Sequence, residues 1–236
     1  MMPKIEISAS VLSADFACLK EAMKRCHSSG IDSIHLDIMD GHFVPNISFG
    51  PVVVRALRPL TKLPMDAHLM IENPQWYIDD FAKAGADIIT VHAECFSPPS
   101  LKPQQANEFP KKTDSVDEGK LLEVIKKIKS ANKKVGLAFN PPSPINITDK
   151  LLNKLNEVLI MSVNPGFSGQ TFIQEVLPKI RELRKRYKGN IQVDGGINDQ
   201  TASQVIKSGA NMLVTASYFF NAKDPKKVVE LLKISH

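Results

Sequence analysis

The chain has 236 residues, of which 43% are hydrophobic and 23% are charged, and it carries a formal net charge of +5. This composition is typical of a globular protein and excludes collagen-like, coiled-coil and largely disordered chains. The sequence lacks the run of about 18 apolar residues that a membrane-spanning helix requires, so we expect no membrane association.

Short apolar runs alternate with amphipathic stretches along the chain. The expected strands, in chain order, are 4–10, 33–39, 65–70, 87–92, 135–139, 158–163, 191–194 and 212–215. The expected helices lie near 15–29, 50–57, 74–84, 119–131, 146–154, 172–187, 199–208 and 224–234. Two of these helices begin with Asn73-Pro74 and Asp224-Pro225, because proline suits the first helical position.

Strands that are separated by helices pair in parallel. Eight such units in a chain of this length predict the α/β class and one closed (β/α)8 TIM barrel, with residues 1–236 forming a single domain. An open doubly wound sheet is the alternative. It usually has fewer strands and a Gly-x-Gly-x-x-Gly turn after the first strand, and the sequence has no such turn.

Residues 96–118 interrupt the alternation. They are polar, rich in proline and without hydrophobic period, and they carry a net charge of −1. Loops longer than about 12–15 residues are usually functional or disordered. We expect a surface insertion in the loop after the fourth strand; a lid or a subunit-contact loop is the alternative.

The positive charge is concentrated in segments 119–134 and 179–188, each with six basic residues against one glutamate. Both segments are expected helices whose apolar residues recur at helical spacing, which leaves the cations on solvated faces. A nucleic-acid surface would need one basic stripe with base-reading or aromatic side chains, so we expect no nucleic-acid partner.

The cysteines, Cys18, Cys26 and Cys95, are too few and too irregularly spaced for a disulfide framework or a thiolate metal site. The first residues lack the apolar core of a signal peptide. We therefore expect reduced thiols and a cytoplasmic location.

Barrel enzymes carry their catalytic groups at the C-terminal ends of the strands. Side chains alternate along a strand, and Met39 and Met70 end two strands on the faces that also carry polar groups. If these faces point inward, four groups converge: His35, Asp37, His68 and Asp194. Two imidazoles and two carboxylates predict a site for one divalent cation, Zn²⁺, Fe²⁺, Mn²⁺ or Co²⁺. A lone strand histidine would more often be a core residue.

The short loops at the expected strand ends contain no lysine or arginine, so a Schiff-base lysine is excluded there. The mouth is instead acidic, through Asp37, Asp40, Asp66, Glu72, Glu94 and Asp194. A phosphate would then depend on a cation or on backbone amides, which glycine turns can supply. The turn residues in question are Gly166, Phe167, Ser168, Gly169, Gly195, Gly196, Ala216 and Ser217. Any one glycine turn is more often plain turn chemistry.

Met39, Met70 and Met161 end three strands, either as core filler or as an apolar lining over the reacting carbons. Asp37 and Asp194 form a carboxylate pair beside the expected cation. In a two-base epimerisation, one such group removes a proton from one face of a carbon and the other returns it to the opposite face. The residues alone thus indicate metal-assisted proton abstraction next to a carbonyl of a phosphorylated substrate.

Five segments closely resemble the ribulose-phosphate (pentose-5-phosphate) 3-epimerase family. They read SASVLSADF at 8–16, HLDIMDGHFVPN at 35–46, DAHLMIENP at 66–74, MSVNPGFSGQ at 161–170 and VDGGI at 193–197. The resemblance spans nearly the whole chain except 96–118. It implies a TIM barrel of the ribulose-phosphate-binding type and an isomerase that interconverts D-ribulose 5-phosphate and D-xylulose 5-phosphate in the pentose phosphate pathway.

The resemblance also implies roles for individual residues. Asp37 and Asp194 would be the acid/base pair, and with His35 and His68 they would hold the metal, which stabilises an enediolate. The remaining substrate contacts would come from Ser10, His68, Met39, Met70 and Met161, with the phosphate on residues 166–169, Gly195, Gly196, Ala216 and Ser217. A homo-oligomer is expected by analogy.

Family members usually have glycine where this chain has Ser168 and Ala216. If either position requires positive φ or very close phosphate approach, the added Cβ would crowd it. Two alternatives stay open. One is a sister epimerase that acts on a related ketose phosphate such as D-allulose 6-phosphate, and the other is a non-catalytic barrel that binds a sugar phosphate.

Overall fold

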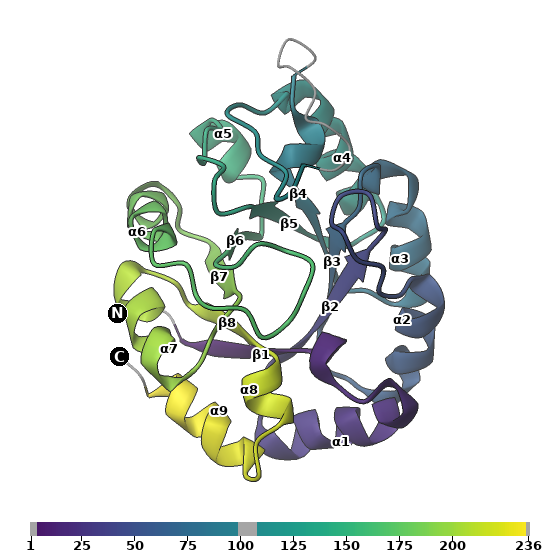
Figure 1. Cartoon of the computed structure of the whole chain (residues 1–236). Coiled ribbons are helices and arrows are strands. Elements are labelled where there is room, and N and C mark those ends of the chain that lie inside the picture. The colour runs from purple at the N-terminus through teal and green to yellow at the C-terminus, as the bar shows by residue number, and fades with distance from the viewer. Residues whose placement is uncertain (1–3, 99–107, 235–236) are drawn as a thin grey trace.

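The computed structural model describes residues 4–98 and 108–234 and forms a closed parallel barrel in which the strands follow one another in chain order (Figure 1). The strands are β1 Glu6–Ser10, β2 Ser33–Met39, β3 Met65–Met70, β4 Ile88–His92, β5 Lys134–Phe139, β6 Glu157–Met161, β7 Asn190–Asp194 and β8 Met212–Thr215. The predicted (β/α)8 barrel is therefore confirmed.

Helices surround the strands (Figure 1). The α-helices of the described residues are α1 Leu19–Ser29, α2 Pro51–Leu57, α3 Ile78–Ala84, α4 Glu118–Ser130, α5 Asp149–Leu152, α6 Val176–Arg186, α7 Asp199–Ser208, α8 Ser217–Phe220 and α9 Pro225–Lys233. None of these described helices is long and apolar enough to cross a membrane.

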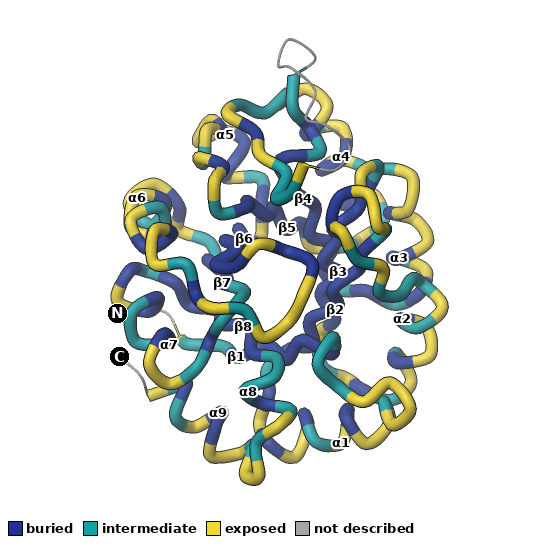
Figure 2. The backbone as a smooth tube through the Cα atoms, in the orientation of Figure 1, coloured by how far each residue is buried: buried dark blue, intermediate teal, exposed yellow. Residues whose placement is uncertain are grey.

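Burial follows from this arrangement: the strands are buried and the helices are exposed on their outer sides (Figure 2). All seven residues of β2 are buried. Its apolar residues Ile34, Leu36 and Ile38 belong to the main hydrophobic core. The alternate positions, including His35 and Asp37, carry the polar side chains, so β2 supplies both core packing and site chemistry.

Several helices are shorter than the sequence predicts. The segments expected at 15–29 and 74–84 begin as 3-10 turns, Phe16–Cys18 and Pro74–Trp76, before α1 and α3 start. The helix expected at 146–154 is reduced to the four residues of α5. The helix expected at 172–187 begins only at Val176, because residues 172–175 form a loop in which the Ile173 N–H donates to the Ser162 carbonyl. The short helix α8 was not predicted, because four residues are too few for a periodic pattern.

The insertion expected at 96–118 begins at the end of the 3-10 helix after β4 and ends with the first residue of α4, and residues 99–107 of it fall outside the described part of the chain. Its two ends meet, because the Asp117 N–H donates to the Phe96 carbonyl at 2.7 Å. The Asn140 side chain donates to the Lys111 carbonyl at 2.8 Å, and the Thr113 N–H donates to the Ser143 hydroxyl at 3.1 Å. The described part of the insertion therefore packs on the loop that follows β5.

Candidate active site and cation site

A cavity of about 340 Å³ opens at the C-terminal ends of the strands. Residues from six strands line it: Ser10, Asp37, Met39, Met70, Met161, Asp194 and Val214. The remaining lining comes from the loop at 165–170 and from Gly195–Asn198 and Ala216–Tyr218, with Leu12, Val163 and Asn221. None of these described lining residues is a lysine or arginine.

The loop after β6 reaches across the mouth (Figure 1). The Asn46 side chain, in the loop after β2, donates to the Gly166 carbonyl at 2.6 Å. Strands β2 and β6 lie four positions apart around the eight-stranded barrel, so this hydrogen bond joins opposite sides of the opening. Gln170 holds the same loop by donating to the carbonyls of Asn164 and Phe167.

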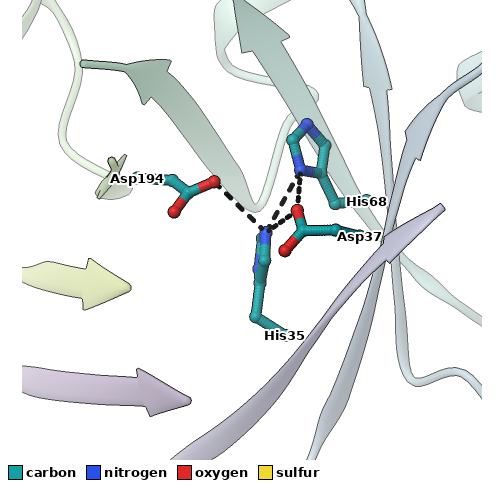
Figure 3. A group of neighbouring side chains, drawn as sticks. All are labelled: His35, Asp37, His68 and Asp194. Atoms are coloured by element: carbon teal, nitrogen blue, oxygen red, sulfur yellow. Dashed lines mark hydrogen bonds and ion pairs between the residues drawn. The ribbon is translucent and has the colours of Figure 1, made fainter. Parts of the chain in front are cut away.

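Four side chains from β2, β3 and β7 meet (Figure 3); of these, Asp37 and Asp194 line the cavity, whereas His35 and His68 are fully buried. One ligand atom from each of His35, Asp37, His68 and Asp194 lies within 4.8 Å of all the others. Asp37 Oδ1 is 3.0 Å from His68 Nδ1 and 3.3 Å from His35 Nε2. His35 Nε2 is 3.1 Å from His68 Nδ1 and 3.9 Å from Asp194 Oδ2.

These separations fit a four-coordinate divalent cation. Zinc bonds of roughly 2.0–2.1 Å to nitrogen and oxygen place tetrahedral ligand atoms about 3.3–3.4 Å apart. The donor set of two imidazoles and two carboxylates also suits Fe²⁺, Mn²⁺ and Co²⁺. The residues present are therefore compatible with the expected metal.

The register of β2 against β3 places Asp37 and His68 at one level of the barrel, with His35 one layer deeper. His35 pairs with Asp66, and two residues further along Asp37 pairs with His68. Asp66 consequently lies one layer deeper than His68. It is 1% exposed and its Oδ2 is 3.2 Å from His35 Nδ1, while its Oδ1 accepts a hydrogen bond from Thr90 at 2.8 Å. The prediction that Asp66 lies at the mouth is wrong.

Glu94 also does not face the mouth. It lies in the short 3-10 helix Ala93–Phe96 that follows β4, and its side chain is fully buried. Oε2 lies 3.1 Å from Nδ1 of His92, and His92 Nε2 lies 2.8 Å from His68 Nε2. His92 was not predicted, although a histidine at the end of a strand, next to a strand that carries another histidine, is a usable signal. Asp40 and Glu72 do stay near the rim, where Asp40 Oδ2 accepts the Glu72 N–H.

The two aspartates of the cluster differ in their electrostatics. Burial raises the pKa of Asp37, but the neighbouring His35 charge and hydrogen bonds from His35 and His68 outweigh it, so the pKa lies below its usual range. For Asp194, burial and the Asp37 charge raise the pKa to about 7 despite His35. One carboxylate is therefore held ionised while the other binds a proton near neutral pH.

The two histidines differ as well. Burial lowers the pKa of His68 to about 4, against the hydrogen bond to Asp37, and the neighbouring His92 and His35 act in the same direction as burial. Burial also opposes the charged form of His35, yet Asp37 and Asp66 raise its pKa above the usual range. In the metal-free protein His68 is thus neutral, and His35 carries a proton between two carboxylates.

Met39, Met70 and Met161 are each at most 4% exposed and line the cavity. Met39 and Met70 form a small apolar cluster with Phe43 and Val44. The three side chains are therefore both packed and in contact with the cavity, so the two interpretations of these residues do not exclude one another.

All eight turn residues considered for phosphate lie on the same cavity. Gly166, Gly169, Gly195 and Gly196 have positive φ, and a Cβ added to Gly196 would lie 2.8 Å from the Phe172 nitrogen. Ala216 has φ −123°, and Asn132 is the only non-glycine residue with positive φ in the described ranges. Ser168 and Ala216 therefore do not occupy conformations that require glycine.

Comparison with known proteins places these observations in a family. Residues 6–116 and 99–220 match the sequence model described as "Ribulose-phosphate 3 epimerase family". The chain is 44% identical to ribulose-phosphate 3-epimerase of Bacillus subtilis over 97% of this chain and 98% of that one. It is 38% identical to the Escherichia coli K12 enzyme of the same name over the full length of both chains.

Solved structures show the same fold at low sequence identity. A 3-hexulose-6-phosphate synthase aligns with a TM-score of 0.63 at 17% identity, over 98% of this chain and 99% of that chain. Orotidine 5'-phosphate decarboxylase from Pyrococcus horikoshii aligns with a TM-score of 0.61 at 14% identity, over 97% and 98%. At this identity the similarity concerns the fold alone.

Proposed function

We propose that this chain, which belongs to the ribulose-phosphate 3-epimerase family, interconverts D-ribulose 5-phosphate and D-xylulose 5-phosphate, a reaction of the pentose phosphate pathway. It is an isomerase that acts on carbohydrates. The observation that carries the proposal is the pair Asp37 and Asp194, which reach one cavity from β2 and β7 with pKa values shifted in opposite directions.

The two carboxylates are proposed to act on opposite faces of C3. In each direction one carboxylate accepts the C3 proton while the other delivers a proton, which it carries on the oxygen that does not hold the cation. In the reverse direction the roles exchange. Asp37 Oδ1 faces the two histidines, whereas Oδ2 accepts a hydrogen bond from Ser10 at 2.5 Å, so the two oxygens have separate partners.

His35, Asp37, His68 and Asp194 would hold one divalent cation, which would stabilise negative charge on the substrate oxygens next to C3. The neutral state of His68 suits a ligand, because an imidazole binds metal through an unprotonated nitrogen. Met39, Met70 and Met161 would cover the reacting carbons and exclude water from them.

The phosphate is proposed to bind at the other end of the cavity, on 166–169, Gly195, Gly196, Ala216 and Ser217. The acidic inner end would repel it, and backbone N–H groups at glycine turns bind anions without a cationic side chain. The Ser168 hydroxyl adds a donor to this surface.

The assignment is tested by comparing the turnover of D-ribulose 5-phosphate and D-allulose 6-phosphate in the presence of Zn²⁺, Fe²⁺, Mn²⁺ or Co²⁺. We expect the pentose phosphate to have the higher kcat/KM, and Asp37→Asn and Asp194→Asn each to lose nearly all activity. A higher kcat/KM for the hexose phosphate would reassign the substrate. Full activity in either variant would reject that residue as acid/base.

We further propose that the protein works in the cytoplasm as a homo-oligomer. Cys18, Cys26 and Cys95 are free thiols, which is typical of a reducing compartment. Large apolar side chains at Ile47, Val52 and Trp76 are 66–76% exposed, which supports contact with another copy. Sedimentation velocity would test the assembly, and a monomer at assay concentration would contradict it.

A further inference from the structure

Two further buried side chains lie on the Nε2 side of the His68 ring, whereas Asp37 lies on its Nδ1 side. His92, the last residue of β4, places Nε2 2.8 Å from His68 Nε2, and its Nδ1 lies 3.1 Å from Glu94 Oε2. The His68, His92 and Glu94 side chains are all fully buried. Neither His92 nor Glu94 lines the cavity, and the proposed proton transfer assigns them no part.

Fixed donors and acceptors set the direction of these hydrogen bonds. The backbone N–H of Asn140 donates to Glu94 Oε1 at 2.8 Å, so Oε1 is a hydrogen-bond acceptor. Lys179 Nζ donates to the Asn140 carbonyl at 2.9 Å and holds that peptide in place. With Glu94 as a carboxylate, its other oxygen accepts from His92 Nδ1–H.

The proton on the His92 ring determines which nitrogen of His68 is protonated. A neutral imidazole carries one proton, so His92 with a proton on Nδ1 presents an unprotonated Nε2 to His68. The His68 nitrogen that faces it must then be the N–H donor. His68 is thereby left with an unprotonated Nδ1, and this is the atom 3.0 Å from Asp37 Oδ1 and 3.1 Å from His35 Nε2.

We propose that His92 and Glu94 are positioning residues that hold His68 in the Nε2–H tautomer, so that its Nδ1 lone pair faces the cation site. The inference rests on the proposed cation site. Ring geometry supports the orientation: the His68 and His92 ring planes are inclined by 23° with centroids 4.9 Å apart, as expected for two nearly coplanar rings that meet through Nε2, and Phe43 lies 4.6 Å from the His92 ring.

The opposite tautomer would disable the ligand. If His68 carried its proton on Nδ1, that N–H would point at Asp37 and no lone pair would face the cation. Partners that fix the tautomer and orientation of a ligating histidine typically change metal affinity about 10–100-fold when they are removed. His92 and Glu94 are expected to have an effect of this size although they touch neither cation nor substrate.

Glu94→Gln is the most direct variant, because it keeps the shape and removes one acceptor. The carboxylate accepts hydrogen bonds from both His92 Nδ1–H and the Asn140 N–H. A glutamine side chain has one acceptor oxygen and one NH₂ donor, so its NH₂ group would face one of these two N–H groups. Ser97→Ala is the matched control: the Ser97 hydroxyl donates to the Glu94 backbone carbonyl at 3.1 Å and leaves the carboxylate untouched.

Two readouts without substrate are needed. The first is Co²⁺ and Zn²⁺ affinity by competition with a chromophoric chelator, and the second is the protonated ring nitrogen of His68 by long-range ¹H–¹⁵N NMR. We expect Glu94→Gln to bind Co²⁺ about 10–100-fold more weakly, Ser97→Ala to bind as the wild type does, and the metal-free wild type to carry the His68 proton on Nε2.

His92→Gln provides a rescue test. A glutamine amide can present its oxygen to His68 Nε2–H and its NH₂ to Glu94, so it copies the donor and acceptor pattern of His92, whereas His92→Leu copies neither. We expect His92→Gln to bind Co²⁺ more tightly than His92→Leu. If the leucine variant does not fold, Glu94→Gln decides the question.

Wild-type affinity in Glu94→Gln, or a His68 proton on Nδ1 in the wild type, would overturn the inference. Neither result depends on epimerase activity. A wild-type protein that binds Co²⁺ as described but fails to epimerise the sugar phosphate would instead reject the proposed function and leave the positioning role intact.

Discussion

Ser10 distinguishes the surroundings of Asp37 from those of Asp194. Ser10 is the last residue of β1, and its hydroxyl donates a hydrogen bond of 2.5 Å to Asp37 Oδ2. The Ser10 residue is 2% exposed. A buried hydrogen bond to a charged group contributes roughly 1.5–3 kcal/mol. Ser10 therefore helps to keep Asp37 ionised and fixes the direction of the oxygen that the histidines do not contact.

Ser10→Ala should lower kcat about tenfold or more, since the lost bond to a charged group is worth roughly 1.5–3 kcal/mol. KM should change less, because the phosphate contacts lie elsewhere in the cavity. Steady-state kinetics checks this split, with thermal unfolding as the control for folding. A kcat equal to that of the wild type would show that the hydrogen bond plays no part in the proton transfer.

The apparent cation affinity should rise with pH. The His35 pKa is raised above its usual value, chiefly by Asp37 acting against burial, and burial together with the Asp37 charge raises that of Asp194 to about 7. The ligating nitrogen of His35 and the ligating oxygen of Asp194 must both be unprotonated to bind the cation. Cation binding therefore releases protons, and the affinity falls as the pH falls.

Calorimetric titration in buffers of different ionisation enthalpy measures the protons released. Below pH of about 7 we expect a release of more than one proton, because Asp194 also contributes there. Release that does not change with pH across the neutral range would contradict the coupling of His35 and Asp194 to the cation.

At the scale of residues, the sequence predicts which side chains face the barrel interior better than it predicts how deep in the barrel they lie. Alternation along β2 and β3 is enough to put His35, Asp37 and His68 on inward faces. The same alternation puts Asp66 on an inward face, but the layer it occupies depends on the pairing of β2 with β3, which a single strand does not reveal. Glu94 was misplaced because the 3-10 turn after β4 directs it inward.

At the scale of elements, the start of α7 links a helix cap to the cavity. Asn198 accepts from the backbone N–H groups of Gln200 and Thr201 at 2.9 and 3.1 Å, and the Thr201 hydroxyl accepts the Asn198 N–H at 2.9 Å. This capping box begins two residues after Gly196, and Asn198 itself lines the cavity.

Asn198→Ala should lower the free energy of unfolding by about 1 kcal/mol, the usual cost of losing such a cap, and should raise KM for the sugar phosphate. Urea unfolding and kinetics measure the two effects. The exposed Gln200→Ala is the control, because it keeps the capped backbone N–H. Equal stability of the two variants would contradict the role of the cap.

Strand positions were predictable because each strand is a short apolar run between turn residues, whereas helix starts were not. The 3-10 turns before α1 and α3 have residues compatible with helix, so periodicity extends the predicted helix through them. Helix α5 shrinks to Asp149–Leu152, and the three prolines at 141, 142 and 144 keep the preceding chain in a loop.

At the scale of the whole molecule, barrel closure joins the first and last strands, since β1 pairs with β8. The proposed cation ligands come from β2, β3 and β7, so a bound cation connects strands on different sides of the barrel. We propose that residues 1–236 fold as one domain, in which cation binding and barrel stability are coupled.

Removing the cation should therefore lower Tm in a single cooperative transition. A ligand that binds the folded state alone stabilises it by about 2.7 kcal/mol at 100 times its Kd. Calorimetry with excess Zn²⁺ and with a chelator measures the shift, and Asp194→Asn should shift less. Two separate transitions, or equal Tm with and without cation, would contradict this account.

The central claim is two-base proton transfer at C3, and solvent isotope exchange tests it most directly. D-ribulose 5-phosphate is incubated in D₂O with the cation-loaded protein, and deuterium at C3 is followed by NMR in substrate and product. We predict incorporation at C3 during turnover by the wild type, and none with Asp37→Asn. Epimerisation without deuterium at C3, or undiminished incorporation in Asp37→Asn, would contradict it.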